Sequence, residues 1–159
     1  MGRRPFLPAA TALLLLLLAP AHAWADVTAF FGMATSDGRR SARGVSFGLS
    51  LVVVGFEVEY ANIVESETNG TPSMKTTSFN GVVQSPGRTQ VYATAGGGYY
   101  NQHFRDIQAT GFGTNIGGGI KIGIAGPFRA RVDYRVFSQR GQPFQKTTQR
   151  IYAGINLSF

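Results

Sequence analysis

The chain has 159 residues, no cysteine and a formal net charge of +7. The lack of cysteine excludes disulfides and thiolate zinc sites as sources of stability. The 12 Phe, 6 Tyr and 21 Gly residues point toward β structure. No segment after residue 25 is apolar over the length that a membrane helix needs. A membrane location would therefore require a closed β-barrel, in which every backbone polar group is paired.

Residues 1–25 have the pattern of a cleavable secretory signal peptide. Two arginines come first, an unbroken leucine run follows, and small-x-small cleavage patterns end at Ala23 and Ala25. We expect cleavage after Ala25, with Ala23 as the alternative. An uncleaved membrane anchor is disfavoured because the apolar run is short for a bilayer. Residues 26–159 then form one domain, which keeps 13 of the 15 Lys and Arg against 8 Asp and Glu.

Eight runs with a two-residue alternation follow, separated by turn-forming residues. They cover residues 27–35, 44–52, 55–64, 75–84, 89–100, 111–123, 128–138 and 148–159. Between them lie all four prolines of the mature chain: Pro72, Pro86, Pro127 and Pro143. A closed sheet requires this, because proline cannot donate a hydrogen bond to a neighbouring strand. The turn between the second and third runs is not located, since only Gly55 signals one there.

The connections between the runs alternate in length. Those at 36–43, 65–74, 101–110 and 139–147 are long and polar, whereas those at 85–88 and 124–127 are tight. Short periplasmic turns and longer outer loops are typical of bacterial outer-membrane barrels.

Charged and apolar residues alternate most clearly in the last two runs. Alternation alone does not decide whether the apolar face is a soluble core or a lipid-facing wall. The charges on the polar faces favour an ionic interior, where they are stable when paired, and aromatic residues near the run ends suit a membrane boundary. The expected interior network is Glu57, Glu59, Lys121, Arg129, Arg131, Asp133, Arg135 and Arg150.

The chain ends in a strand-like segment with an aromatic terminal residue. Tyr152, Gly154, Leu157 and Phe159 resemble the C-terminal assembly signal of bacterial outer-membrane barrels. The mature chain as a whole is similar to the small eight-stranded barrels of the outer-membrane protein A, X and W type. This resemblance implies an eight-stranded antiparallel up-and-down transmembrane β-barrel in the outer membrane of a Gram-negative bacterium. It also implies that barrel assembly machinery recognises the C-terminal strand.

The glycine-rich central runs share this resemblance and also have a steric reason. An eight-stranded barrel has an interior only just wide enough for side chains. Glycines on one wall leave room for long Arg and Glu side chains from the other. The glycines expected to do so are Gly96, Gly98, Gly117 and Gly119.

A filled interior argues against a wide pore, since porin channels need about 16 strands or more. We therefore expect a monomeric structural or surface-interaction protein, with no cofactor and no metal. Its outer loops would carry any binding, with cations directed at the phosphates of lipopolysaccharide. The expected loop cations are Arg39, Arg40, Arg43, Arg105, Arg140 and Lys146. Ordinary solvated loop charge is the alternative interpretation.

Three other functions stay open: a lipid-modifying enzyme, a narrow channel on the same scaffold, and a soluble lipocalin-like binder. Catalysis is not expected, because His103 is the only histidine after residue 25 and has no evident serine partner. The lipid deacylases of this architecture carry a His-x-Ser element, which Phe104 and Arg105 interrupt here. Nucleic-acid binding is not expected either, because basic residues in 128–138 alternate with lipid-compatible ones.

Overall fold

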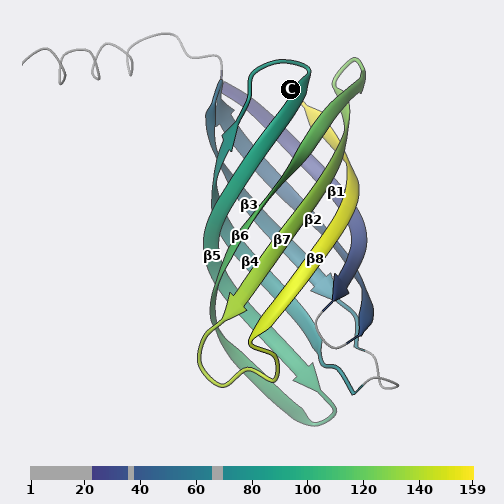
Figure 1. Cartoon of the computed structure of the whole chain (residues 1–159), viewed down its shortest axis with the longest axis vertical. Helices are drawn as coiled ribbons and strands as arrows, with labels where there is room; N and C mark the ends of the chain where they lie inside the picture. Colours follow the sequence, from purple (N-terminus) through teal and green to yellow (C-terminus); the bar gives the residue numbers. More distant parts are fainter. Residues whose placement is uncertain (1–22, 36–37, 66–69) are drawn as a thin grey trace, which may run out of the picture.

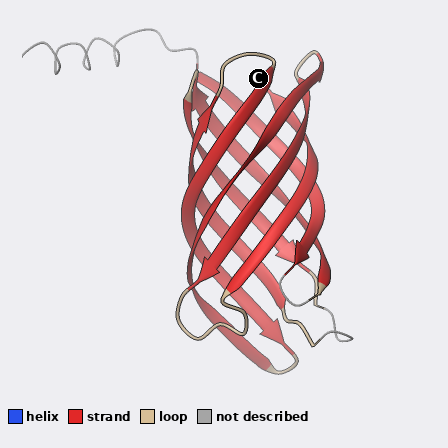
Figure 2. Ribbon diagram, viewed as in Figure 1, coloured by secondary structure: helices blue, strands red, loops and turns tan. Residues whose placement is uncertain are grey.

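The chain folds into one closed sheet. The computed structural model describes residues 23–35, 38–65 and 70–159. Its strands are β1 (Ala23–Thr35), β2 (Arg39–Leu51), β3 (Val54–Ile63), β4 (Ser73–Gln84), β5 (Thr89–Phe104), β6 (Ile107–Ala125), β7 (Phe128–Gln139) and β8 (Thr147–Ser158). Each strand pairs antiparallel with the next, and β8 pairs with β1 to close the barrel (Figure 1, Figure 2). The predicted eight-stranded antiparallel barrel is confirmed. Within these ranges, no helix is long and apolar enough to span a membrane.

The barrel is apolar outside and ionic inside. Successive side chains of a strand point to opposite faces, and along β4 and β8 exposed residues alternate with buried ones. Phe47, Val132 and Ile155 are 45%, 44% and 52% exposed, whereas Arg131 and Glu57 are 1% and 3% exposed. This is the inverse of a soluble core. The alternative of a soluble barrel with an apolar interior is therefore wrong.

The connections at the two ends of the barrel differ. At the end that holds the C-terminus, they are residues 52–53, 85–88 and 126–127 (Figure 1). At the opposite end the described parts of the connections are residues 38, 64–65, 70–72, 105–106 and 140–146. In outer-membrane barrels the longer connections lie at the outer end, so this second end is called the outer end.

Two of the predicted long outer loops are wrong. Residues 39–43 belong to β2, and residues 101–104 and 107–110 belong to β5 and β6. The strands continue through these polar segments because their backbones stay paired with the neighbouring strands. The β5–β6 hairpin therefore extends farthest at the outer end (Figure 1).

The turn that the sequence did not locate consists of Val52 and Val53. Val52 has a φ of 24°, which is unfavourable for a β-branched residue. Gly55, the expected turn signal, instead lies in β3 and faces the interior. A Cβ there would lie 2.7 Å from the Leu49 carbonyl oxygen, so the close approach of β2 explains this glycine.

The barrel closes between its first and last strands, β1 and β8. Ala25 and Phe159 exchange two backbone hydrogen bonds, each of 2.9 Å. Most of the expected signal peptide, residues 1–22, lies outside the described residues, and its last three residues form the start of β1. Cleavage after Ala25, or after Ala23, stays a prediction.

Candidate functional site

The centre of the barrel is crossed by ion pairs between β3 and β7. Alternation places Glu57 and Glu59 of β3 and Arg131 and Arg135 of β7 inside. Arg131 Nη1 lies 2.5 Å from Glu57 Oε2, and Arg135 Nη2 lies 2.5 Å from Glu57 Oε1. Arg135 Nη1 is also 3.2 Å from Glu59 Oε2. These contacts connect opposite walls of the barrel.

Further ion pairs lie along the wall of β7 and beside β1. Asp133 Oδ2 is 3.1 Å from Arg131 Nη2, and Asp133 Oδ1 is 3.0 Å from Arg135 Nε. Lys121 Nζ lies 2.7 Å from Asp26 Oδ2. Asp26 was not among the interior charges expected from the sequence. Its neighbour Val27 is exposed, so alternation along β1 places Asp26 inside once the strand is known.

The network is electrically balanced. Arg150 of β8 donates a hydrogen bond to Glu59. Within the part of the chain that the structure describes, these ion pairs join equal numbers of bases and acids: Lys121, Arg131, Arg135 and Arg150, with Asp26, Glu57, Glu59 and Asp133. Mutual pairing and the accompanying hydrogen bonds offset the desolvation cost of placing these charges in the interior. Arg129 was predicted here wrongly: it is half-buried at the barrel end and donates to Gln90 Oε1 at 2.6 Å.

Aromatic side chains fill the space around these charges. Tyr92 donates a hydrogen bond to Asp133 and accepts one from Arg131 Nε at 2.7 Å. Phe30 and Tyr152 stack with their ring centroids 4.1 Å apart. The Arg131 guanidinium lies 4.8 Å from the Tyr92 ring centroid, within the range of a cation–π contact. The interior is therefore packed with protein groups.

The inward-facing glycines give this packing its room, as predicted. A Cβ at Gly117 would lie 2.6 Å from Arg135 Cγ, and one at Gly119 would lie 2.7 Å from the Tyr92 hydroxyl oxygen. A Cβ at Gly96 would lie 2.3 Å from Asn80 Oδ1. Contacts this short cannot be accommodated without displacing the neighbour.

The outer mouth is covered by two connections. Arg40 donates hydrogen bonds to the Pro72 carbonyl and, at 2.7 Å, to Gln145 Oε1. Gln102 Oε1 accepts one from the Phe144 N–H at 2.8 Å. The apolar cluster within this end of the barrel is Ala34, Ala42, Ile63 and Met74. Arg40 was predicted as an exposed loop cation. That prediction is wrong, because Arg40 is 3% exposed and holds these connections over the mouth.

The mouth at the opposite end, beside the short connections, opens into a cavity of about 310 Å³. Its polar lining includes Ser50, Gln84, Arg88, Gln90 and Arg129. The neighbouring gap toward Lys121 and Glu57 measures only about 10 Å³. The cavity is therefore a vestibule that ends at the ion pairs.

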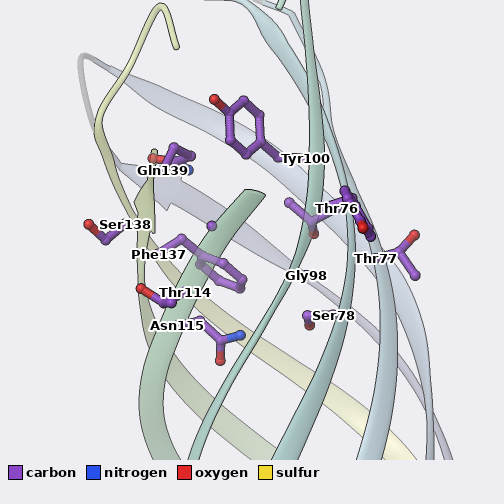
Figure 3. Close-up of a pocket in the computed structure, with 12 residues that line it drawn as sticks. Thr76, Thr77, Ser78, Gly98, Tyr100, Thr114, Asn115, Phe137, Ser138 and Gln139 are labelled. Atoms are coloured by element: carbon purple, nitrogen blue, oxygen red, sulfur yellow. The ribbon is translucent and has the colours of Figure 1, made fainter. Parts of the chain in front are cut away.

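A second small gap lies among β4, β5, β6 and β7 (Figure 3). It measures about 10 Å³ and is lined by residues such as Thr76, Ser78, Gly98, Tyr100 and Phe137. This is the space of a single water molecule. The gap is too small for an organic ligand.

The predicted outer cations other than Arg40 are exposed. Arg105, Arg140 and Lys146 lie in connections, but Arg39 and Arg43 lie on β2 and face outward from the barrel wall. Lys75 at the start of β4 was missed as a site residue and is also exposed. Its position in an expected strand gave no reason to group it with loop cations.

The one histidine among the described residues does not form a catalytic arrangement. His103 is exposed on β5, and Ser73 Oγ donates to its backbone carbonyl oxygen at 3.1 Å, not to its imidazole. Within residues 23–35, 38–65 and 70–159, no three His, Cys, Asp or Glu side chains could hold a metal ion.

The C-terminal motif occupies β8 and Phe159, the residue that follows it, with its expected alternation. Tyr152 faces the interior, whereas Leu157 and Phe159 face outward. Gly154 lies beside Phe30, and a Cβ there would be 2.9 Å from Phe30 Cβ. This glycine thus has a packing role in addition to its place in the motif.

The barrel has the architecture of small eight-stranded outer-membrane proteins. The N-terminal β-barrel domain of Pseudomonas aeruginosa OprF matches with a TM-score of 0.67 and 18% identity, over 86% of this chain and 97% of that one. Neisserial surface protein A matches over the same shares, with a TM-score of 0.68 and 13% identity.

The attachment invasion locus protein Ail of Yersinia pestis, solved with the heparin analogue sucrose octasulfate, gives a TM-score of 0.56 and 12% identity. That match covers 86% of this chain and 97% of Ail. No family model and no curated protein matches the sequence. At these identities the comparisons show the shared fold.

Proposed function

We propose that the chain is a monomeric outer-membrane protein with a closed interior, whose outer rim binds the phosphates of lipopolysaccharide. The outer rim is defined as Arg39, Arg43, Lys75, Arg105, Arg140 and Lys146. The observation that carries the proposal is the distribution of charge. The interior bases and acids that pair are matched, whereas the rim cations outnumber the described acids near them, Glu65 and Asp106.

The outward wall supports a lipid environment. Its exposed aromatic and aliphatic side chains come from all eight strands. In water, so much exposed apolar surface would promote aggregation, whereas in a bilayer it contacts acyl chains. The eight-stranded outer-membrane barrels with the same fold point to the outer membrane of a Gram-negative bacterium.

The rim supports binding of a phosphorylated surface. Lysine and arginine form charge-assisted hydrogen bonds with phosphate oxygens. Lipopolysaccharide presents phosphates in the outer leaflet, beside the outer end of such a barrel. The Ail barrel, which shares this fold, was solved with a polysulfated sugar analogue, so a barrel of this shape is compatible with polyanion binding.

Two alternatives on the same scaffold are less well supported. A narrow channel requires a continuous path, but the vestibule ends at the ion pairs, and Arg40 and Gln102 hold the connections over the outer mouth. A lipid-modifying enzyme requires an activated nucleophile or water, and the hydroxyl of Ser73 bonds a backbone oxygen of His103.

The membrane part of the proposal is tested by electrophoresis without heating. The detergent-extracted protein should migrate as a compact folded band and shift only after boiling. A water-soluble protein with no shift would contradict the membrane assignment. In planar bilayers the folded protein should give no steady conductance, and a stable open level would contradict the closed interior.

The binding part is tested with lipopolysaccharide-containing vesicles. Neutralising Arg39, Arg105, Arg140 and Lys146 together to Gln should weaken binding of the folded protein, and added salt should weaken binding of the unmodified protein. Arg88→Gln, on a periplasmic turn, is the matched control. Equal binding by the rim variant and the control would reject the rim as the binding surface.

A further inference from the structure

A shallow groove crosses the outward wall at β1, β2 and β3. It measures about 480 Å³, and its apolar floor includes Ala29, Gly44 and Val45. Ala29 on this wall has only a methyl group, whereas neighbouring Phe31 projects outward and is 73% exposed. Gly44 contributes only backbone to the groove, since a Cβ there would point inward, 2.5 Å from Phe30 Cζ. The small Ala29 side chain therefore leaves a depression between larger side chains on a surface that faces acyl chains.

One end of this groove is polar. Arg43 and Asn62 line it together with Tyr60, and Arg43 is the register partner of Asn62 on β3 and of Phe31 on β1. Among the residues that the structure describes, Arg43 makes no hydrogen bond or ion pair. A guanidinium on the lipid-facing wall is unfavourable away from the interface, so an anionic partner at this position would stabilise it.

A second cation lies beside the same polar end. Lys75 of β4 is the register partner of Asn62 and is exposed. Arg43 and Lys75 therefore flank Asn62 across three adjacent strands. Neighbouring strands are about 4.8 Å apart, which places the two backbones about 10 Å apart. Both side chains are long enough to reach one headgroup.

We propose that this groove binds one lipopolysaccharide molecule, with an acyl chain on Ala29 and Val45 and headgroup phosphate on Arg43 and Lys75. The inference rests on the proposed function, because it requires the outer end of the barrel to lie in the outer leaflet. The proposed function assigns binding to the outer rim as a whole. The groove adds one defined site on the barrel wall, which holds a single lipid molecule. The apolar floor and the paired cations match the amphiphilic chemistry of a phosphorylated glycolipid, which carries two phosphates on its lipid anchor.

Native mass spectrometry of the detergent-extracted barrel tests the site. The probes are lipid A with both phosphates, lipid A without phosphates, and phosphatidylglycerol. Bisphosphorylated lipid A should bind one-to-one and more tightly than either other lipid. Arg43→Gln should weaken this binding about tenfold, the effect of losing one hydrogen bond to a charged group.

A steric variant separates the groove from general charge attraction. Ala29→Phe fills the apolar floor without changing the charge and should also weaken binding of bisphosphorylated lipid A. Ala95→Phe is the matched control, because Ala95 is an exposed alanine on β5 outside the groove. Arg88→Gln is the charge control. Each variant is first shown to fold by its heat-dependent mobility.

Equal binding of phosphate-free lipid A or of phosphatidylglycerol would overturn the assignment to lipopolysaccharide. An equal effect of Ala29→Phe and Ala95→Phe would overturn the groove. If the groove variants bind like the unmodified protein while the rim variant still loses vesicle binding, the groove is rejected and the proposed function stands. If neither set changes binding, both are rejected.

Discussion

Glu57 on β3 and Arg135 on β7 meet across the whole barrel, with Arg135 Nη2 2.5 Å from Glu57 Oε1. Three strands separate β3 from β7 in either direction around the sheet, so the pair joins opposite walls. The second oxygen of the same carboxylate lies 2.5 Å from Arg131 Nη1. A single acid thus orients two buried guanidinium groups.

Removing that acid should destabilise the barrel strongly. Glu57→Ala leaves Arg131 and Arg135 with one acceptor fewer inside, and breaking a buried pair in this way costs about 3–5 kcal/mol. The free energy of unfolding in urea, followed in lipid vesicles by the heat-dependent mobility shift, measures the effect. Asp106→Ala, on an exposed turn, should change it by less than about 0.5 kcal/mol. Equal effects of the two variants on the free energy of unfolding would show that the ion-pair network does not stabilise the barrel more than an exposed charge does.

Gly117 should not tolerate even a methyl group. Gly117→Ala places a Cβ 2.6 Å from Arg135 Cγ and 2.3 Å from the Tyr134 carbonyl oxygen, and overpacking of this kind costs about 1–3 kcal/mol. Gly81→Ala is the matched control on the outward wall, where the nearest atom to the new Cβ is 3.8 Å away. The same urea unfolding curves distinguish them. A destabilisation by Gly81→Ala as large as that by Gly117→Ala would refute the steric explanation.

A substitution that relieves the backbone strain in the turn at Val52 and Val53 should stabilise the barrel. Val52 has a positive φ, and left-handed backbone costs an ordinary residue about 1–2 kcal/mol, less for asparagine. Val52→Asn should therefore raise the free energy of unfolding by about 1 kcal/mol. Val53→Asn changes the same turn at a residue without positive φ and should give no such gain. If Val53→Asn stabilises as much, the effect comes from polarity and not from backbone strain.

The strand count, the pairing order and the direction of each side chain could be read from the sequence. Period-two alternation is a property of each strand alone. Within β7 and β8 it separates a charged face, which includes Arg131, from an apolar face, which includes Ile155. Once the apolar face is placed in lipid, the residues on the opposite face of each strand are those that line the interior. Seven of the eight predicted interior charges lie in the ion-pair network for this reason.

The position of a residue along the barrel axis could not be read in the same way. Arg129 has the correct inward direction but lies at the barrel end, because alternation carries no information about height. Arg40 was assigned to a loop, since a polar strand beyond the apolar region resembles a loop in composition. The turn at Val52 has no sequence signal, and Asp26 follows directly on the expected signal peptide.

The terminal aromatic ring should matter for assembly in cells. Phe159→Ala removes a side chain that is 64% exposed and keeps the two backbone hydrogen bonds with Ala25. We expect a lower amount of folded protein in cell membranes but normal refolding of the purified chain in detergent. Leu157→Ala removes another outward side chain of the motif and should act in the same direction. A variant that refolds as poorly in detergent as it assembles in cells would point to a purely structural role.

The central claim is that the apolar wall contacts acyl chains while the interior stays closed to water. The absence of cysteine allows a single nitroxide label at Val132→Cys in vesicles, where collision with oxygen and with a water-soluble nickel chelate can be compared. Because Val132 is 44% exposed on the wall, oxygen collisions should dominate at this site. Dominant nickel collisions would show that the wall faces water and would contradict the account.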